Sequence, residues 1–310
     1  ASRMIREWFR IARDVDRLVE RVSPDAVLSL ERGPHCDLYR AGDGVHRRWM
    51  RIKYGSSRRW MINLVNWVNP HLERRSVTRA GTIVANSEMV AGDLRAEYPE
   101  LESSKIRVVR NGFDPVRFNL DGVGPLPEEC AEDADEGRCA LFLGSGFERK
   151  GLAWAVRFFA ELCHQDSSWG ERGCLWIAGR GKPEPYRRLG SELGVSGKMR
   201  FLGVVAEPAE LCRQAQVMVL PTSYDPFANA TLEALACGCP VVTTVANGAS
   251  EVVEPGRTGW ILKDLLPDAV EESARKFLAT PAVDRSSVAA SVAGFTRQQE
   301  LDAFSELLLG

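Results

Sequence analysis

The sequence predicts an α/β protein with two parallel sheets, each covered by helices. The first observation is that short apolar runs alternate with stretches of helical spacing along most of the chain. The second is that these runs are nearly continuous in apolar residues, which is typical of strands buried on both faces of a parallel sheet. With 310 residues, of which 45% are hydrophobic, the chain has enough apolar material for two such domains.

The N-terminal domain is expected over residues 1–120. Apolar residues recur with helical spacing from Ser2 to Val22, so this segment is predicted to be a helix. Helical stretches also separate four short apolar runs, as in a sheet of parallel strands. The predicted strands are residues 26–30, 37–42, 82–87 and 106–112.

Residues 121–138 are predicted to be an acidic linker, because they contain Gly and Pro and show little periodicity. Asp133 and Asp135 stand in a D-x-D spacing that resembles a metal-binding motif. A solvated acidic linker explains them better, so we predict no metal site and no cofactor there.

A C-terminal domain is expected over residues 139–292, followed by a helix at 293–310 that packs back toward the N-terminal domain. Its predicted strands are residues 139–145, 174–180, 199–204, 217–222, 240–245 and 259–263. Ligands of parallel sheets bind beyond the carboxyl ends of the strands. The loops after Leu143, Ala178, Leu202, Leu220 and Thr244 should therefore line one cleft.

The first of these loops suggests an anionic ligand, and the next two are not specific alone. Gly144 and Gly146 permit close approach to the backbone. Arg149 and Lys150 are predicted to open a helix, where cations oppose the macrodipole unless an anion is bound; two solvated surface cations are the alternative. The next loops offer Gly179 with Arg180, and Val204, whose backbone groups could meet the edge of a base.

The segment after the strand at 217–222 carries two acids in apolar surroundings. Asp225 and Pro226 are predicted to start a helix. Asp225, Asn229 and Glu233 are four residues apart and would lie along one side of it. A simple helix cap accounts for Asp225 but not for Glu233. A half-buried polar row needs partners, so we expect ligand hydroxyl groups there, with an anion or further oxygens on the amides of residues 226–229.

These motifs resemble the retaining, nucleotide-sugar-dependent glycosyltransferases of family 4, which have the GT-B fold. The resemblance is carried by "PFANATLEALACGCPVV" with the acids Asp225 and Glu233, by "GSGFERKG", by "TVANGASEVVEPGRTGWIL", by "ANSEMV" and by "IRVVRNGFDPVRF". It covers nearly the whole chain. "DLYRAGDG" (37–44), and Asp225 in place of the commoner Glu, are similar to the lipopolysaccharide core glucosyltransferase I group.

The resemblance implies a donor site in the C-terminal domain. Glu233 would hold the ribose hydroxyls of the nucleotide, and Arg149 with Lys150 would clamp the diphosphate without a metal. Asp225 would hold the hydroxyls of the donor sugar. The backbone amides at Phe227, Ala228 and Asn229 would assist it.

On the other side of the cleft, the resemblance places Asp43 of "AGDG" near the reacting sugar. A simple turn aspartate between two glycines is the alternative. His35 and His46 are further candidates for that position, each more readily explained as structural.

The expected reaction is transfer of a hexose, most simply glucose from UDP-glucose, to a sugar hydroxyl of a lipopolysaccharide-core or other lipid-linked acceptor. The alternatives are a mannosyltransferase using GDP-mannose and a non-catalytic nucleotide-sugar-binding protein. The second alternative arises because the family's first domain opens with a strand and a Gly-rich loop. This chain begins on a predicted helix and joins the pattern at Ala26, so the N-terminal domain is expected to lack its first strands. The donor base and sugar, the acceptor and the oligomeric state stay open.

Residues 46–67 form a basic stretch without Asp or Glu, in which Arg and Lys alternate with Trp and Tyr. Such a stretch is typical of segments that lie on anionic membranes. A solvated helix with its Trp side chains toward the core is the alternative. Nucleic acid is not expected, because the chain after residue 120 is acidic (18 basic and 27 acidic residues) and no nucleic-acid motif is present.

The eight cysteines lie mostly in apolar segments without metal-like pairing, so we predict reduced, buried thiols. No apolar run reaches the length of a membrane span. The expected location is the cytoplasm, at the surface of the inner (plasma) membrane.

Overall fold

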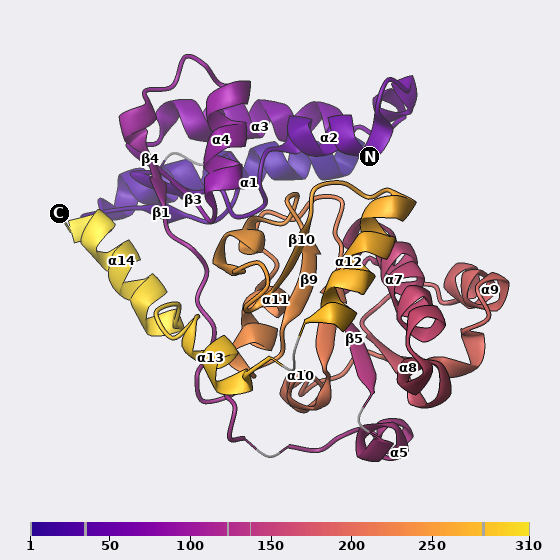
Figure 1. The fold of residues 1–310 in the computed structure, drawn as a ribbon. Helices are drawn as coiled ribbons and strands as arrows, with labels where there is room; N and C mark the ends of the chain where they lie inside the picture. The colour runs from indigo at the N-terminus through magenta and orange to yellow at the C-terminus, as the bar shows by residue number, and fades with distance from the viewer. Residues whose placement is uncertain (1, 34–35, 123, 137, 281–282, 310) are drawn as a thin grey trace. The chain divides into compact units, whose positions relative to one another are not determined.

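A computed structural model describes residues 2–33, 36–122, 124–136, 138–280 and 283–309. The chain forms two compact units (Figure 1). Unit 1 comprises Ala1–Asn111 and Gln298–Gly310, and unit 2 comprises Gly112–Arg297. Among the described helices, none combines the length and the apolar character needed to cross a membrane.

Unit 1 is built on a sheet of four parallel strands in the order β1-β2-β3-β4. The strands are β1 Leu28–Ser29, β2 Leu38–Arg40, β3 Thr82–Ala85 and β4 Ile106–Val108. Each lies inside a segment predicted to be a strand, and helix α1 spans the predicted Ser2–Val22. The further helices are α2 His46–Tyr54, η1 Arg58–Ile62, α3 Val65–Arg79, α4 Glu88–Glu97, η2 Ser103–Lys105 and α14 Arg297–Leu309.

The two faces of this sheet are covered by different parts of the chain, since successive strand residues point to opposite sides. Tyr39 and Ile83 belong to a buried cluster with Leu94 of α4. Leu38 and Val84 pack instead with Phe304 of α14. Helix α14 thus supplies a core residue to strands that lie more than 200 positions earlier in the chain.

Unit 2 is built on a sheet of six parallel strands in the order β10-β9-β8-β5-β6-β7. All six predicted strands are confirmed: β5 Cys139–Leu143, β6 Cys174–Ala178, β7 Met199–Gly203, β8 Val217–Leu220, β9 Val241–Thr244 and β10 Gly259–Leu262. The order turns back between β5 and β8, which is the place where parallel sheets of this kind bind ligands.

Helices cover both faces of this sheet, with α7 and α12 packed together on one face and α11 on the other (Figure 1). The helices are α5 Glu128–Glu136, α6 Phe147–Lys150, α7 Leu152–Gln165, α8 Ser167–Arg172, α9 Glu184–Glu192, α10 Ala209–Gln214, α11 Asn229–Ala236, α12 Pro267–Ala279 and α13 Arg285–Ala290. Two short 3-10 helices, η3 Ser196–Lys198 and η4 Gly248–Val252, complete the unit. All eight cysteines are free thiols and seven of them are buried, as predicted.

The expectation of an irregular linker through residue 138 is corrected for residues 128–136, which form α5. Asp133 on this helix accepts hydrogen bonds from Trp176 Nε1 (3.1 Å) and from Arg200 Nη2 (3.0 Å). These partners lie on β6 and β7, some 40 to 70 residues away in sequence. Asp133 is therefore held against the sheet of unit 2 instead of being solvated.

The substitution Gly151→Ala is expected to destabilise unit 2 strongly. Gly151 has a φ of 80°, and a Cβ there would stand 1.9 Å from the carbonyl oxygen of Pro221. Gly194 has a similar φ of 74° but open space around it, so Gly194→Ala measures the conformational cost alone, about 1–2 kcal/mol. Urea unfolding should show a clearly larger loss for Gly151→Ala, and equal losses would contradict the clash.

Candidate functional site

The loops at the carboxyl ends of β5 to β8 are hydrogen-bonded to one another. After β5, Gly144 N donates to Ala178 O, and Gly146 N donates to Arg180 O (both 2.9 Å). After β6, Gly179 N donates to Gly203 O of β7 (2.6 Å). Arg149 O accepts from Ser223 N in the loop after β8 (2.9 Å). Four of the loops predicted to line one cleft therefore form one edge of unit 2.

Close packing of these loops depends on Gly179. A Cβ at this position would stand 2.1 Å from the carbonyl oxygen of Gly144, and the φ of Gly179 is 139°. A side chain there would force the loops after β5 and β6 apart. Gly146, with a φ of 79°, lies in open space at the start of α6, so it is needed for its backbone conformation and not for room.

One carboxylate at this edge holds two cations. Asp225 Oδ2 accepts from Arg149 Nη1 at 2.6 Å and from Lys150 Nζ at 2.7 Å. Arg149 Nη1 also donates to the carbonyl oxygen of Tyr224 (3.0 Å). The Asp225 side chain is only 8% exposed. Two cations against one carboxylate leave the group positively charged, which suits an anionic ligand.

The helix-terminus argument for Arg149 and Lys150 was wrong. They occupy the last turn of the four-residue α6, and Gly151 then separates them from α7. Cations at the end of a helix are favoured by its dipole even without an anion. The argument for an anion therefore depends on the excess of positive charge around Asp225.

The prediction that Asp225 starts a helix was also wrong. Helix α11 begins at Asn229, with Ala228 as its N-cap residue. Asp225 lies in extended backbone that pairs with Asn247, and its carboxylate is taken by the two cations. Of the predicted polar row, only Asn229 and Glu233 lie on the helix, one turn apart.

Asn247, which the sequence analysis did not single out, is the buried partner that organises this turn. Its Oδ1 accepts from the amides of Ala228 (3.1 Å) and Ala249 (3.0 Å). Its Nδ2 donates to the hydroxyls of Thr231 and Thr243 (both 3.0 Å). The sequence analysis expected the Ala228 amide to bind a ligand, but this amide is already bound to Asn247. The available signal was a single Asn two residues after the strand at 240–245.

Glu233 is the acid at this edge without a bonding partner: within the described residues its carboxylate accepts no hydrogen bond. Burial raises the pKa of Glu233, while the positive charges of Arg117, Arg297 and Lys150 lower it, and the net shift is upward. A partly buried carboxylate near cations is suited to accept hydrogen bonds from ligand hydroxyls.

The remaining predicted donor residues differ in exposure. Phe227 and Ala228 are buried and belong to the core of unit 2. Asn229 and Arg180 are exposed, and so is Val204. In the described part of unit 2 and unit 1, no group of three or more His, Cys, Asp or Glu side chains is arranged to hold a metal ion.

In unit 1, Asp43 lies in a turn and its side chain is 74% exposed. Its Oδ2 accepts from Arg32 Nη1 at 3.2 Å. His46 is half-buried by contrast: its Nε2 lies 3.2 Å from Asn66 Oδ1 and its Nδ1 lies 3.4 Å from Asn69 Nδ2. Burial and the charge of Arg32 lower the pKa of His46. Both ring nitrogens are thus engaged inside unit 1, and His35 lies outside the described residues.

The basic stretch at 46–67 has compensating acids that its own sequence did not reveal. Arg47 and Arg51 both bind Glu97, and Arg48 lies 3.5 Å from Asp93. Both carboxylates come from α4, 45 to 50 residues further along the chain. The stretch contains six cations: Arg47, Arg48, Arg51, Lys53, Arg58 and Arg59. Three of them are paired with acids, so the expectation that no acid compensates this stretch is corrected.

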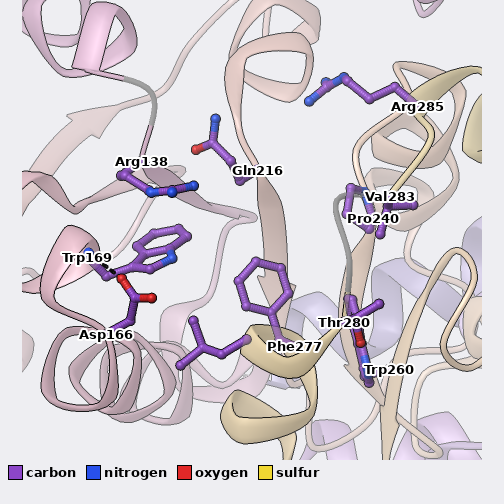
Figure 2. Close-up of a pocket in the computed structure, with 11 residues that line it drawn as sticks. Arg138, Asp166, Trp169, Gln216, Pro240, Trp260, Phe277, Thr280, Val283 and Arg285 are labelled. Atoms are coloured by element: carbon purple, nitrogen blue, oxygen red, sulfur yellow. Dashed lines mark hydrogen bonds between the residues drawn. The ribbon is translucent and has the colours of Figure 1, made fainter.

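A cavity of about 490 Å³ lies at the opposite edge of the unit 2 sheet (Figure 2). Its wall includes Arg138, Gln216 and Pro240, which directly precede β5, β8 and β9. Arg285, which also lines it, donates to the carbonyl oxygens of Ala215 and Cys237. The rest of the wall is a mixture of aromatic, aliphatic and polar side chains: Trp169, Trp260, Phe277, Leu278, Val283, Asp166 and Thr280. The cavity shares no residue with the donor-site candidates.

Residues 137–280 match the family described as glycosyl transferases group 1. Unit 2 contains a group 1 glycosyltransferase domain. Relatives include D-inositol 3-phosphate glycosyltransferase of Streptomyces scabiei, 28% identical over 234 residues (71% of this chain, 51% of the relative). Alpha-maltose-1-phosphate synthase of Mycolicibacterium smegmatis is 30% identical over 200 residues (63% and 51%). The chain thus spans about half the length of these relatives.

Solved structures show the same fold. WaaG, a glycosyltransferase involved in lipopolysaccharide biosynthesis, matches with a TM-score of 0.76 and 19% identity, over 96% of this chain and 81% of WaaG. HepE of Anabaena, solved in complex with UDP-glucose, matches with a TM-score of 0.66 and 17% identity, over 87% and 72%. The predicted GT-B fold is thereby confirmed for this chain.

The substitution Asp225→Asn is expected to strengthen binding of inorganic pyrophosphate, because it removes the carboxylate that competes for Arg149 and Lys150. Partial solvent exposure of Arg149 limits the gain to about 1 kcal/mol, or roughly fivefold in affinity. Isothermal titration calorimetry measures it. Asp166→Asn is the matched control, since Asp166 caps α8 at the opposite edge and Asn keeps the cap. Weaker pyrophosphate binding by Asp225→Asn would mean that the carboxylate orients the cations instead.

Proposed function

We propose that this chain is a retaining glycosyltransferase that moves glucose from UDP-glucose to a sugar hydroxyl of a lipopolysaccharide-core or other lipid-linked acceptor. The observation that carries the proposal is the convergence of Arg149 and Lys150 on Asp225 within the group 1 domain. UDP-glucose is favoured as donor because HepE is solved with it. The lipopolysaccharide acceptor is favoured by the likeness to WaaG.

In the proposed reaction the two cations receive the diphosphate. The acceptor oxygen forms a bond to C1 of the sugar, and the bond between C1 and the diphosphate breaks, its electron pair leaving with the diphosphate oxygen, on which negative charge develops. The proton of the acceptor hydroxyl passes to an oxygen of the departing diphosphate. Arg149 and Lys150 stabilise that charge as it develops. Asp225, once its cations turn to the phosphates, is free to accept hydrogen bonds from the sugar hydroxyls. Asp43 of unit 1 is proposed to act near the reacting sugar.

The ribose is assigned to Glu233. Its carboxylate has no partner among the described residues, and it lies close enough to Lys150 for that cation to lower its pKa. The half-buried backbone at Gly179 and the exposed backbone at Val204 are proposed to meet the phosphates and the base. No divalent metal is required in this proposal, because the protein's own cations supply the positive charge.

Turnover of UDP-glucose tests the proposal. Purified protein should release UDP in the presence of lipopolysaccharide truncated after its inner core, and the anomeric configuration of the product should match that of the donor by NMR. EDTA should leave the rate unchanged. Faster turnover of GDP-mannose than of UDP-glucose would show that GDP-mannose is the donor. Loss of activity in EDTA with recovery in Mn²⁺ or Mg²⁺ would overturn the metal-free mechanism, and failure to bind or turn over any nucleotide sugar would overturn the function.

Affinity for UDP is expected to fall as the pH is lowered. The fall should begin at a higher pH than it would if Glu233 had the pKa of an ordinary glutamate. Folding raises the pKa of Glu233, so protonation, which removes its capacity to accept from two hydroxyls, begins at a higher pH. Comparison of wild type with Glu233→Gln by calorimetry cancels the titration of UDP itself. Glu233→Gln should bind UDP about 1–3 kcal/mol more weakly at neutral pH, and an identical pH dependence in both proteins would contradict the assignment.

The raised pKa of Glu233 weakens UDP binding at low pH but favours the folded state there. A raised pKa in the folded state stabilises the fold at low pH, and this contribution is lost as pH rises through the folded-state value. At neutral pH the neutral Glu233→Gln should therefore be at least as stable as wild type. Urea unfolding separates this effect from a loss of ligand affinity caused by misfolding.

We further propose that residues 46–67 dock the protein on the cytoplasmic face of the anionic inner membrane. Near its middle, Arg58 and Arg59 have no carboxylate partner in the described part of unit 1. The neighbouring apolar side chains are exposed, Ile62 by 85% and Trp67 by 50%, together with Met61 and Leu64. Cations beside exposed apolar and aromatic side chains are suited to an anionic interface.

Replacing Arg58 and Arg59 by Gln should lower affinity for phosphatidylglycerol vesicles by about 1 kcal/mol per cation at low salt. Arg47→Gln with Arg48→Gln is the matched control, because these cations are already paired with acids of α4. Vesicle sedimentation measures both. Equal losses in the two variants would contradict the assignment to Arg58 and Arg59, and no binding by wild type would remove the membrane proposal.

A further inference from the structure

Unit 1 contains a buried acid that the proposed donor site does not use. Glu73 of α3 is 1% exposed. Its Oε1 accepts from the hydroxyl of Tyr98 at 2.7 Å, at the C-terminal end of α4. Its Oε2 accepts from Arg32 Nε at 3.1 Å and from the backbone N–H of His46 at 3.0 Å, at the start of α2. One carboxylate thus ties together three helices and the segment before β2.

Arg32 connects Glu73 to the turn that contains Asp43. Its Nε is bound to Glu73, as described. Its Nη1 donates to Asp43 Oδ2 (3.2 Å), and its Nη2 donates to the carbonyl oxygen of Gly44 (3.0 Å). All three nitrogens of a planar, rigid group are thereby engaged, and the Arg32 side chain is only 13% exposed.

The turn itself has little else to hold the Asp43 carboxylate. Gly44 N donates to Ala41 O (3.1 Å), and Asn86 Nδ2 donates to Gly42 O (3.1 Å), so two contacts fix the backbone. The carboxylate is mostly in solvent, and Arg32 is its recorded partner in the described part of the chain. Without Arg32 the side chain of Asp43 would rotate about two torsions with nothing to select one orientation.

A purely stabilising role explains this arrangement poorly. Burying an ion pair is costly, and apolar residues of similar size often serve stability as well or better. Here Arg32 binds the buried carboxylate of Glu73 on one side and the exposed carboxylate of Asp43, at a turn, on the other. That is the arrangement by which a supporting residue fixes the position of a reacting group.

We propose that Arg32 is a positioning residue that holds the Asp43 carboxylate in the orientation needed for sugar transfer, and that Glu73 holds Arg32. This inference rests on the proposed function and deepens it. Glu73 and Arg32 touch no reacting atom; they act through Asp43.

The main test is a double-mutant cycle between Arg32→Met and Asp43→Asn, with UDP-glucose as the donor. Arg32→Met should lower kcat by about 10- to 100-fold, the scale expected when a reacting group is misplaced by about 1 Å. KM for UDP-glucose and the affinity for UDP should change by less than about twofold. Because Arg32 acts through Asp43, the double variant should be no slower than Asp43→Asn alone.

Two further variants separate positioning from folding. Arg32→Met leaves Glu73 as an unpaired buried charge, so Arg32→Met with Glu73→Gln restores neutrality and keeps hydrogen-bonding groups for Tyr98 and His46. This folded double variant should show the same loss of kcat, and Arg32→Lys should recover part of it. Arg75→Met is the matched control: Arg75 lies on α3 like Glu73, and its substitution breaks an ion pair with Asp16 of α1 without touching the turn, so this variant should keep wild-type kcat.

Additive losses in the cycle, an Asp43→Asn variant as active as wild type, or an equal loss of kcat in Arg75→Met would each overturn the inference while leaving the proposed function standing. A fall in UDP affinity equal to the fall in turnover would overturn it as well, since positioning of Asp43 leaves donor binding unchanged. Absence of both UDP binding and turnover in wild type identifies instead a failure of the proposed function, on which the inference rests.

Discussion

The geometry of the sheet edge that carries Asp225 and Glu233 depends on one buried amide, that of Asn247. It binds the backbone at Ala228 and at Ala249, and the hydroxyls of Thr231 and Thr243, so it joins β9, η4 and the start of α11. A fully buried amide whose four hydrogen bonds are satisfied adds specificity, because any other arrangement leaves polar groups unpaired. This fixes where α11 begins, and the start of α11 fixes the direction of Glu233.

The residues on either side of Asn247 also fix the position of Asp225. Its amide donates to Ala246 O, and its carbonyl oxygen accepts from Gly248 N. The backbone on both sides of Asn247 therefore holds Asp225 in extended conformation, with its carboxylate toward Arg149 and Lys150. The two acids of this edge are then distinguished by their surroundings: one is neutralised by cations, and the other lies partly buried without a bonding partner.

The fold could be predicted from the sequence because its signals are local. Ten apolar runs gave ten strands, and the spacing from Ser2 to Val22 gave α1, since each pattern is set by burial within one element. The errors concern contacts between distant segments. Asp225 resembled a helix cap because Pro226 follows it, but Arg149 and Lys150, some 75 residues earlier, compete for its carboxylate. Asp133 and the arginines of α2 were misjudged for the same reason.

The candidate site was therefore predictable in composition but not in its pairing. Arg149, Lys150, Asp225 and Glu233 were identified from their place after strands and from apolar surroundings. The partnership between Arg32 and Glu73 had no such signal, because a single Glu within a helix and a single Arg in a loop are ordinary surface residues. Only their burial together distinguishes them.

Helix α14 has a consequence for the order in which the chain acquires structure during synthesis. Unit 2 is one continuous segment, Gly112–Arg297, and can complete its core as soon as that segment has left the ribosome. The strands of unit 1 precede unit 2 in the chain, but Phe304 follows it, so Leu38, Val84 and Val109 keep an uncovered apolar surface until unit 2 has been translated. Domains generally become folded from the N-terminus onward. Of these two units, the one whose strands are translated earlier is completed later.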